Sequence, residues 1–170
     1  MELSRDIHPR FAAAIRLLLF TGARKSEIMG LKWTEIDFDH HRLVLSPERT
    51  KTGGRVGERH IPLSSAAVGV LEQIPRTSAW VFTAGRRMNG HARGLQKVWV
   101  TVREHAGLGA LRVHDLRHTF ASLSLANKES LVLISRVLGH TSTRMTERYL
   151  HTDDADMQGL VQRTADGMGW

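Results

Sequence analysis

The stretch VHDLRHTFAS, residues 113–122, combines a folding pattern with a chemical one. Leu116 and Phe120 recur at helical spacing and predict an amphipathic helix. His114 and Arg117 stand three residues apart at the start of that helix, so both side chains can reach one point. Free backbone N–H groups and the helix dipole favour an anion there. The stretch therefore predicts a helix whose first turn faces a negatively charged group.

The segments around this stretch predict a mostly helical domain. Apolar residues recur at helical spacing in four further segments, which are residues 11–19, 67–74, 95–102 and 131–138. In HRLVLS and GERHIPL the apolar spacing drops to two, and the glycine-containing PERTKTGG between them is typical of a hairpin. We therefore expect an α+β domain, mainly α-helical, with a small antiparallel β-sheet near its N-terminal third.

Composition narrows the class of partner. The charge is +7, from 24 Lys and Arg against 17 Asp and Glu, and the basic residues are scattered along the chain. This favours a folded surface that faces nucleic acid, although a well-solvated basic surface would give the same count. The chain has no cysteine, no apolar run near the length of a membrane span and no signal peptide in MELSRDIHPR. A cytoplasmic, nucleoid-associated protein is the simplest expectation.

Further basic residues stand where they could meet the same anion. Arg24, in TGARKSE, lies at the start of another predicted helix. Arg117 also lies near the start of its predicted helix. Two guanidinium groups at helix starts could clamp a phosphate, because each offers parallel donors to two oxygens. His140 directly follows a glycine that ends a helix, which leaves its side chain free to project. Lys51 lies at the tip of the predicted hairpin, where a long amine could reach a ligand.

Tyr149 is the only tyrosine in the chain, and it lies in the polar stretch GHTSTRMTERYLHT, residues 139–152. A tyrosine taken alone is most often half-buried packing, but apolar neighbours are missing here. A free phenol has a pKa of about 10 and needs a base or a strongly positive site to become a nucleophile. Attack on a phosphodiester builds negative charge, which arginine, lysine and histidine groups can meet.

Five pieces together resemble one family. TGARKSEI, RTKTG, HDLRHTFAS, LGHTS and MTERYLH occur in the order and at the separations of the tyrosine recombinase catalytic domain, the phage integrase family. The match extends from about residue 10 to 152. The resemblance implies the DNA breaking–rejoining fold in a single catalytic domain, residues 1–170, with a tail from about 153. It also implies that the separate DNA-clamping domain that usually comes first is absent.

The resemblance assigns a role to each site residue. Tyr149 would be the nucleophile that forms a 3′-phosphotyrosine bond, and Arg24 and Arg117 would bind the non-bridging oxygens of the scissile phosphate. Glu27 would support Arg24 without touching DNA. The bond to phosphorus is stored in the intermediate, so the reaction would need neither ATP nor a metal.

Proton transfer would fall to the other basic residues of the motifs. The resemblance implies that Lys51 protonates the leaving 5′ oxygen and that His114 assists proton transfer at Tyr149. His140 would donate a hydrogen bond to the phosphate.

Two other functions stay open at this point, whereas a zinc site is not favoured. A relaxing topoisomerase would share the phosphotyrosine chemistry, and a catalytically silent DNA-binding module would share the basic surface. His114 and His118 have the spacing of a zinc-binding pair, but Asp115 stands in place of the usual glutamate and no third ligand is evident. We therefore expect double-stranded DNA as the partner and no metal or cofactor.

The tail carries Met157, Leu160 and Val161 at helical spacing. A helix of this length is marginal alone, so its apolar face must be buried against its own domain or a partner's. The family resemblance implies four protomers around two DNA duplexes, and we expect a monomer without DNA. Deleting residues 153–170 should then weaken assembly on paired sites more than cleavage at a single site.

Overall fold

The computed structural model of the chain describes residues 7–49, 57–84, 90–139 and 154–169. The helices and strands follow one another as α1 (Pro9–Thr21), α2 (Lys25–Met29), β1 (Ile36–Asp37), β2 (Arg42–Leu45), β3 (Arg59–Pro62), α3 (Ser65–Glu72), α4 (Leu95–His105), α5 (Asp115–Ala126), α6 (Leu131–Leu138) and α8 (Asp154–Gly167). Short 3₁₀ turns lie at Trp33–Glu35 and Pro47–Arg49. The predicted class, mainly α-helical with a small antiparallel sheet, is confirmed.

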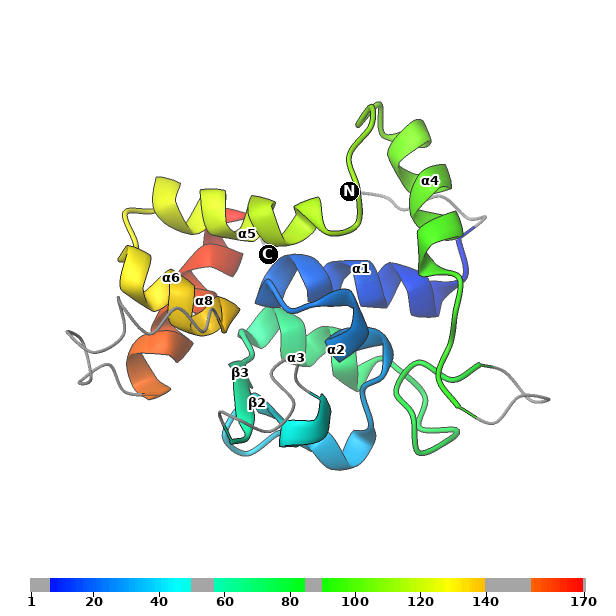
Figure 1. Ribbon diagram of the computed structural model, residues 1–170, viewed down its shortest axis with the longest axis horizontal. Coiled ribbons are helices and arrows are strands. Elements are labelled where there is room, and N and C mark those ends of the chain that lie inside the picture. The colour runs from blue at the N-terminus through cyan, green and yellow to red at the C-terminus, as the bar shows by residue number, and fades with distance from the viewer. Residues whose placement is uncertain (1–6, 50–56, 85–89, 140–153, 170) are drawn as a thin grey trace.

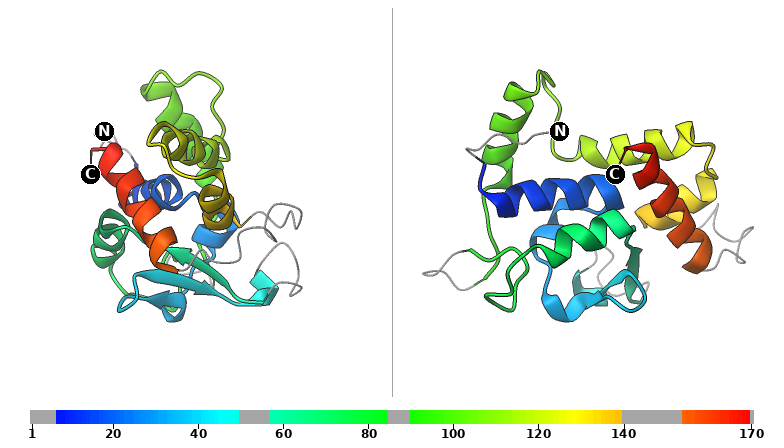
Figure 2. Two further views of the ribbon diagram at one scale, coloured as in Figure 1. Left: turned by 90° about the vertical axis from the view of Figure 1, so that its left-hand side faces the viewer. Right: turned by 180° about the vertical axis from the view of Figure 1, so that it is seen from behind.

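Helix α1 lies at the centre of the molecule (Figure 1). Helix α5 packs along one side of it, and α3 packs on the other side, next to the sheet. Helices α6 and α8 pack against each other beside one end of α1, whereas α4 stands at the opposite end (Figures 1 and 2). Residues far apart in sequence, in α2, β3, α5 and α6, therefore come together around the end of α1.

The sequence of α1 explains both its burial and its end. Phe11, Ile15 and Leu18 form the predicted apolar stripe and are all buried. The helix stops at Gly22, which has a φ of 60° and whose N–H donates to the carbonyl of Leu18 at 3.1 Å. A Cβ at Gly22 would lie 2.7 Å from the Leu138 side chain, so only glycine fits this left-handed position against α6.

The sheet is a three-stranded antiparallel one in the order β1-β2-β3. Leu43 pairs with Ile61, and Leu45 pairs with Arg59. The alternation predicted for β2 is confirmed, because Leu43 and Leu45 are buried and their neighbours are half-buried. In β3 the predicted Ile61 is buried, but Pro62 beside it is buried as well. Strand β1 has two residues, which is too short for any alternation to be read from sequence.

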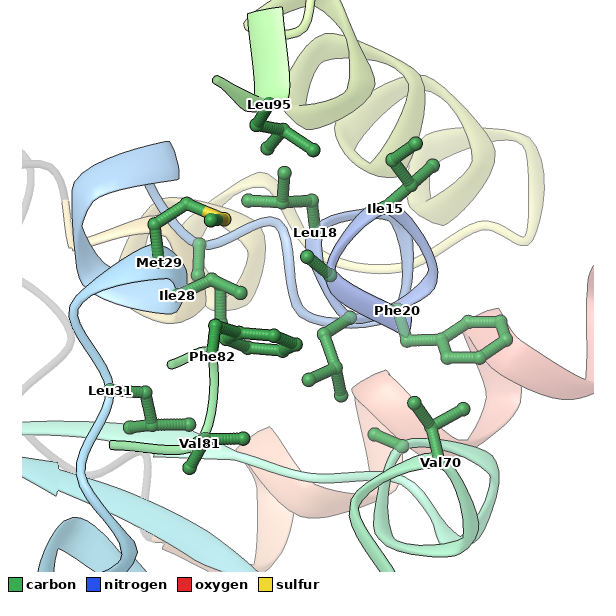
Figure 3. Packing of buried hydrophobic residues seen from close by; sticks show 14 of the residues in the cluster. Ile15, Leu18, Phe20, Ile28, Met29, Leu31, Val70, Val81, Phe82 and Leu95 are labelled. Atoms are coloured by element: carbon green, nitrogen blue, oxygen red, sulfur yellow. The ribbon is translucent and has the colours of Figure 1, made fainter. Parts of the chain in front are cut away.

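The main core gathers side chains from most of these elements. Ile15, Leu18 and Phe20 of α1 meet Ile28 of α2 and Leu95 of α4 in one cluster (Figure 3). Phe82 enters the same interior from the extended segment after α3. This core fixes α2 and the sheet relative to α1, and it thereby fixes the positions from which their polar side chains act.

A smaller cluster joins α5, α6 and α8. Leu160 and Val161 of the predicted tail stripe are fully buried there, against Phe120 of α5 and Val137 of α6. The tail therefore packs on its own domain, and burial on a partner is not needed to satisfy its apolar face. Among the described helices, none combines the length and the apolar composition needed to cross a bilayer.

Candidate active site

Arginines from three separate elements converge on the last turn of α6. Each donates to the carbonyl of one of three consecutive residues: Arg59 to Val137 at 3.2 Å, Arg117 to Leu138, and Arg24 to Gly139 at 3.2 Å. The last carbonyls of a helix have no partner inside the helix and carry the negative end of its dipole. The three guanidinium groups satisfy them, and they hold the backbone next to His140 in sequence.

Glu27 connects two of these arginines. Its side chain is only 1% exposed, and its Oε2 accepts the backbone N–H of Arg24 at 2.7 Å. Its Oε1 accepts from Nη1 of Arg24 at 2.8 Å and forms an ion pair with Nε of Arg59 at 3.0 Å. A buried carboxylate is stable only when it is paired and hydrogen-bonded, and Glu27 meets both conditions.

Arg117 is buried and has no carboxylate beside it within the described ranges. Its Nη1 donates to the carbonyl of Gly22 at 2.7 Å, and its Nη2 donates to Leu138. Burial lowers the pKa of Arg117 to about 10, and the charges of Arg24 and Arg59 add to this effect. Glu27 opposes it.

The cluster therefore has more positive than negative charge. In the part of the chain that the structure describes, Glu27 is the carboxylate in contact with Arg24 and Arg59, and Arg117 contacts backbone carbonyls. Burial also lowers the pKa of Arg59, although Glu27 counteracts this. An anion beside Arg24 and Arg117 would lower the free energy of the cluster by supplying the missing charge.

His114 precedes α5, one turn from Arg117, and is exposed. Burial of part of its ring lowers its pKa below 6.5, and the positive charges of His118, Arg117 and Arg112 contribute to the decrease. The His118 ring stands edge-on to it at 5.4 Å between centroids. Because the shift is downward, His114 is mostly neutral at pH 7 and can accept a proton.

The predicted site residues divide into two groups. Arg24, Glu27 and Arg117 lie around the joined ends of α1, α5 and α6, and His114 lies one turn before Arg117 at the start of α5. Lys51, His140 and Tyr149 lie outside the described residues.

Arg59 is a member of the cluster that sequence reasoning missed. It stands outside the motifs named above, yet its side chain is 9% exposed and contacts Glu27. The signal was present in the strand pattern. Residues two apart in a strand point to the same face, so Arg59 shares its face with Ile61 and Leu63, which are buried. A buried arginine that needs a carboxylate partner could therefore have been predicted at this position.

Comparison with known proteins identifies the family to which this site belongs. The model of the phage integrase family matches residues 2–156. The chain belongs to the phage integrase family. Its fold is that of the tyrosine recombinase catalytic domain, as the motifs predicted. The structure thus places Arg24, Glu27 and Arg117 together, with His114 one turn from Arg117, in a member of this family.

Named relatives agree with this membership. The chain is 31% identical over 166 residues to tyrosine recombinase XerD of Rhizobium meliloti, which covers 90% of this chain and 50% of the relative. The integrase of mycobacterium phage Brujita superposes with a TM-score of 0.72 at 25% identity, over 95% of this chain and 54% of that one.

A DNA-bound neighbour shares the fold. XerH site-specific recombinase bound to its difH substrate gives a TM-score of 0.65 at 22% identity, over 89% of this chain and 45% of that one. The chain spans about half the length of the curated relatives it matches.

Proposed function

We propose that this integrase-family chain is the catalytic part of a site-specific DNA recombinase that cleaves and rejoins DNA through Tyr149. The observation that carries the proposal is the convergence of Arg24 and Arg117 on the end of α6, next to His140 in sequence, in a cluster with surplus positive charge. A scissile phosphate is the anion that such a pair of guanidinium groups fits, since each can donate to two of its oxygens.

The proposed reaction uses the surplus charge in the transition state. The Tyr149 oxygen bonds to phosphorus while the bond to the 5′ oxygen of the next nucleotide breaks. His114, kept neutral by its lowered pKa, takes the phenol proton, and Lys51 gives a proton to the leaving oxygen. Arg24, Arg117 and His140 bind the charge that grows on the phosphate oxygens.

The reverse step rejoins DNA. A 5′-hydroxyl attacks the phosphotyrosine, and a new phosphodiester forms as Tyr149 is released. If the attacking hydroxyl comes from another strand, the result is recombination. If it comes from the same strand, the result is relaxation. The relatives are named recombinases and integrases, and this favours recombination over a topoisomerase or a silent binding module.

We further propose double-stranded DNA as the partner, with other protomers joining in a tetrameric synapse on two duplexes. The DNA-bound neighbours XerH and the Tn1549 transposon integrase support DNA as the partner. Without DNA, the net charge of +7 repels protomers from one another, so a monomer is expected. A protein with this partner would work at the nucleoid.

Covalent capture tests the proposal. The purified chain is mixed with a pool of duplexes that carry a nick within randomised sequence, so that the cleaved strand diffuses away and the adduct accumulates. We expect a denaturant-resistant protein–DNA band, equal in amount with EDTA present, that Tyr149→Phe abolishes. Arg163→Gln, which changes the charge on α8 away from the cluster, is the control and should still form the adduct. An adduct that persists in Tyr149→Phe would exclude Tyr149 as the nucleophile.

A further inference from the structure

We propose that Arg59 is a positioning residue for this site, which fixes the position of Glu27 relative to the end of α6. The proposal rests on the proposed function, because this relative position matters for catalysis only if Arg24 and His140 act on a phosphate. Arg59 lies on β3, outside the motifs that carry the family resemblance.

The contacts of Arg59 form a second bridge between Glu27 of α2 and the end of α6, beside the bridge that Arg24 makes through Glu27 and Gly139. The Nε of Arg59 pairs with Glu27 of α2 at 3.0 Å, and its Nη2 donates to the carbonyl of Val137 in α6 at 3.2 Å. The side chain of Arg59 is 9% exposed, compared with 27% for Arg24. Arg59 is therefore enclosed by protein, whereas Arg24 keeps a face toward solvent where a phosphate could bind.

Gly139 shows that the backbone is shaped around this guanidinium. A Cβ at Gly139 would lie 1.5 Å from Nη1 of Arg59, and the residue has a φ of +66°. Any side chain would thus have to displace Arg59 as well as adopt an unfavourable backbone conformation. The guanidinium occupies the space that the missing side chain leaves, directly beside the residue before His140.

Arg59 also has a role that Arg24 and Arg117 cannot fill. When those two turn donors toward a phosphate, their hold on the carbonyls of Gly139 and Leu138 weakens. Arg59 keeps its two contacts, because neither is directed to the proposed phosphate. A lysine could not replace it, since one ammonium group cannot reproduce a fork that contacts a carboxylate and a carbonyl on different elements.

The first test separates positioning from DNA binding. Arg59→Met and Arg59→Lys are compared with Arg42→Met, which removes an arginine of β2 that pairs with Asp37 instead. With saturating nicked DNA, we expect Arg59→Met to slow adduct formation by roughly 10- to 100-fold, the effect of a displaced catalytic group. Arg59→Lys should be intermediate, and Arg42→Met should match the wild type.

DNA affinity, in contrast to the rate of adduct formation, should be almost unchanged in Arg59→Met. The dissociation constant of Arg59→Met should stay within about threefold of wild type, because an enclosed side chain contributes no phosphate contact. A large loss of affinity with an unchanged rate at saturation would show that Arg59 binds DNA and would overturn the proposal. Unchanged rate and affinity would overturn it equally.

A second test does not depend on activity. Gly139 donates its N–H to the carbonyl of Arg136 at 2.9 Å, so its hydrogen exchange reports on the α6 end. We expect faster exchange in Arg59→Met and unchanged exchange in Arg42→Met. If the wild type forms no adduct, the proposed function fails, and the exchange data still decide whether Arg59 holds this turn.

The Gly139→Ala substitution measures the coupling directly. In the wild type, alanine suffers both the backbone strain and the clash with Arg59. In Arg59→Met, only part of the clash remains, so the drop in melting temperature caused by Gly139→Ala should be smaller. An equal drop in both backgrounds would contradict the close approach. If Arg59→Met fails to fold, the double variant Glu27→Gln/Arg59→Met, which removes both charges, replaces it. Gly139→Ala should again lower the melting temperature less in this background than in the wild type. An equal decrease in melting temperature would contradict the proposal.

Discussion

The end of α6 and helix α8 are both held against the rest of the domain, but by different forces. The α6 end is held by three guanidinium groups on three successive carbonyls, with Glu27 as the carboxylate in contact. Helix α8 is held mainly by buried Leu160, Val161 and Ala165. A buried hydrogen bond of 3.0 Å joins Ser124 and Thr164, and polar contacts of Gln158, Gln162 and Arg163 lie nearer the surface.

The difference shows which region is built for a ligand. Apolar burial stabilises α8 without needing any further group, and its strength depends on area. The α6 end has a surplus of positive charge that burial makes costly, as the lowered pKa of Arg117 shows. Because the positive charge at the end of α6 is only partly neutralised, a bound anion would stabilise this region more than it would stabilise α8. We therefore expect the phosphate to bind at the end of α6.

The comparison predicts its largest effect at α8. Leu160→Ala should lower the free energy of unfolding by about 2–5 kcal/mol, because it opens a cavity where the side chain is fully buried. Leu125→Ala on α5 is the matched control, since that leucine is 46% exposed and its loss should cost about 0.5 kcal/mol or less. Urea unfolding measures both. Equal effects of the two substitutions would mean that α8 is not part of the core.

The same burial corrects our expectation for the tail. Deleting residues 153–170 would uncover Phe120 and Val137, so it should impair folding and single-site cleavage as well as assembly. The expectation that assembly suffers more than single-site cleavage came from a stripe of three residues, which does not reveal the surface on which it packs.

The smallest effect concerns His114, at the edge of the charged region. Its folded pKa lies below 6.5, so between that value and 6.5 the unfolded chain binds more protons, and stability falls as the pH drops through this window. Proton NMR titration should give a midpoint below 6.5 for His114, and Arg112→Gln should raise it by removing a nearby positive charge. A midpoint at or above 6.5 in the wild type would contradict the account of this region.

Much of the fold could be predicted because its signals are local. The α1 stripe, the alternation in β2 and the glycine that ends α6 all depend on residues within a few positions of one another. Strand β1 was missed because two residues carry no period. The surface on which α8 packs was left open, because the choice depends on tertiary packing.

The site could be predicted only in part, for a similar reason. Arg24, Glu27, His114 and Arg117 stand in motifs, and the structure brings the two arginines and Glu27 together with His114 one turn from Arg117. The meeting of Arg59 with Val137 is a contact between residues 78 apart in sequence, and no local pattern names that partner. The sequence could show that a buried arginine on a strand needs a carboxylate partner. Only the fold shows that this partner is Glu27.

The central claim is that the charged end of α6 binds a phosphate, and thermal unfolding with and without inorganic phosphate tests it most directly. At tenfold excess over its dissociation constant, phosphate should stabilise the folded chain by about 1.4 kcal/mol, and chloride at equal ionic strength should not. Leu160→Ala should lower the melting temperature and keep the phosphate response, whereas Arg24→Gln should lose the response. Equal stabilisation by chloride, or a full response in Arg24→Gln, would contradict the account.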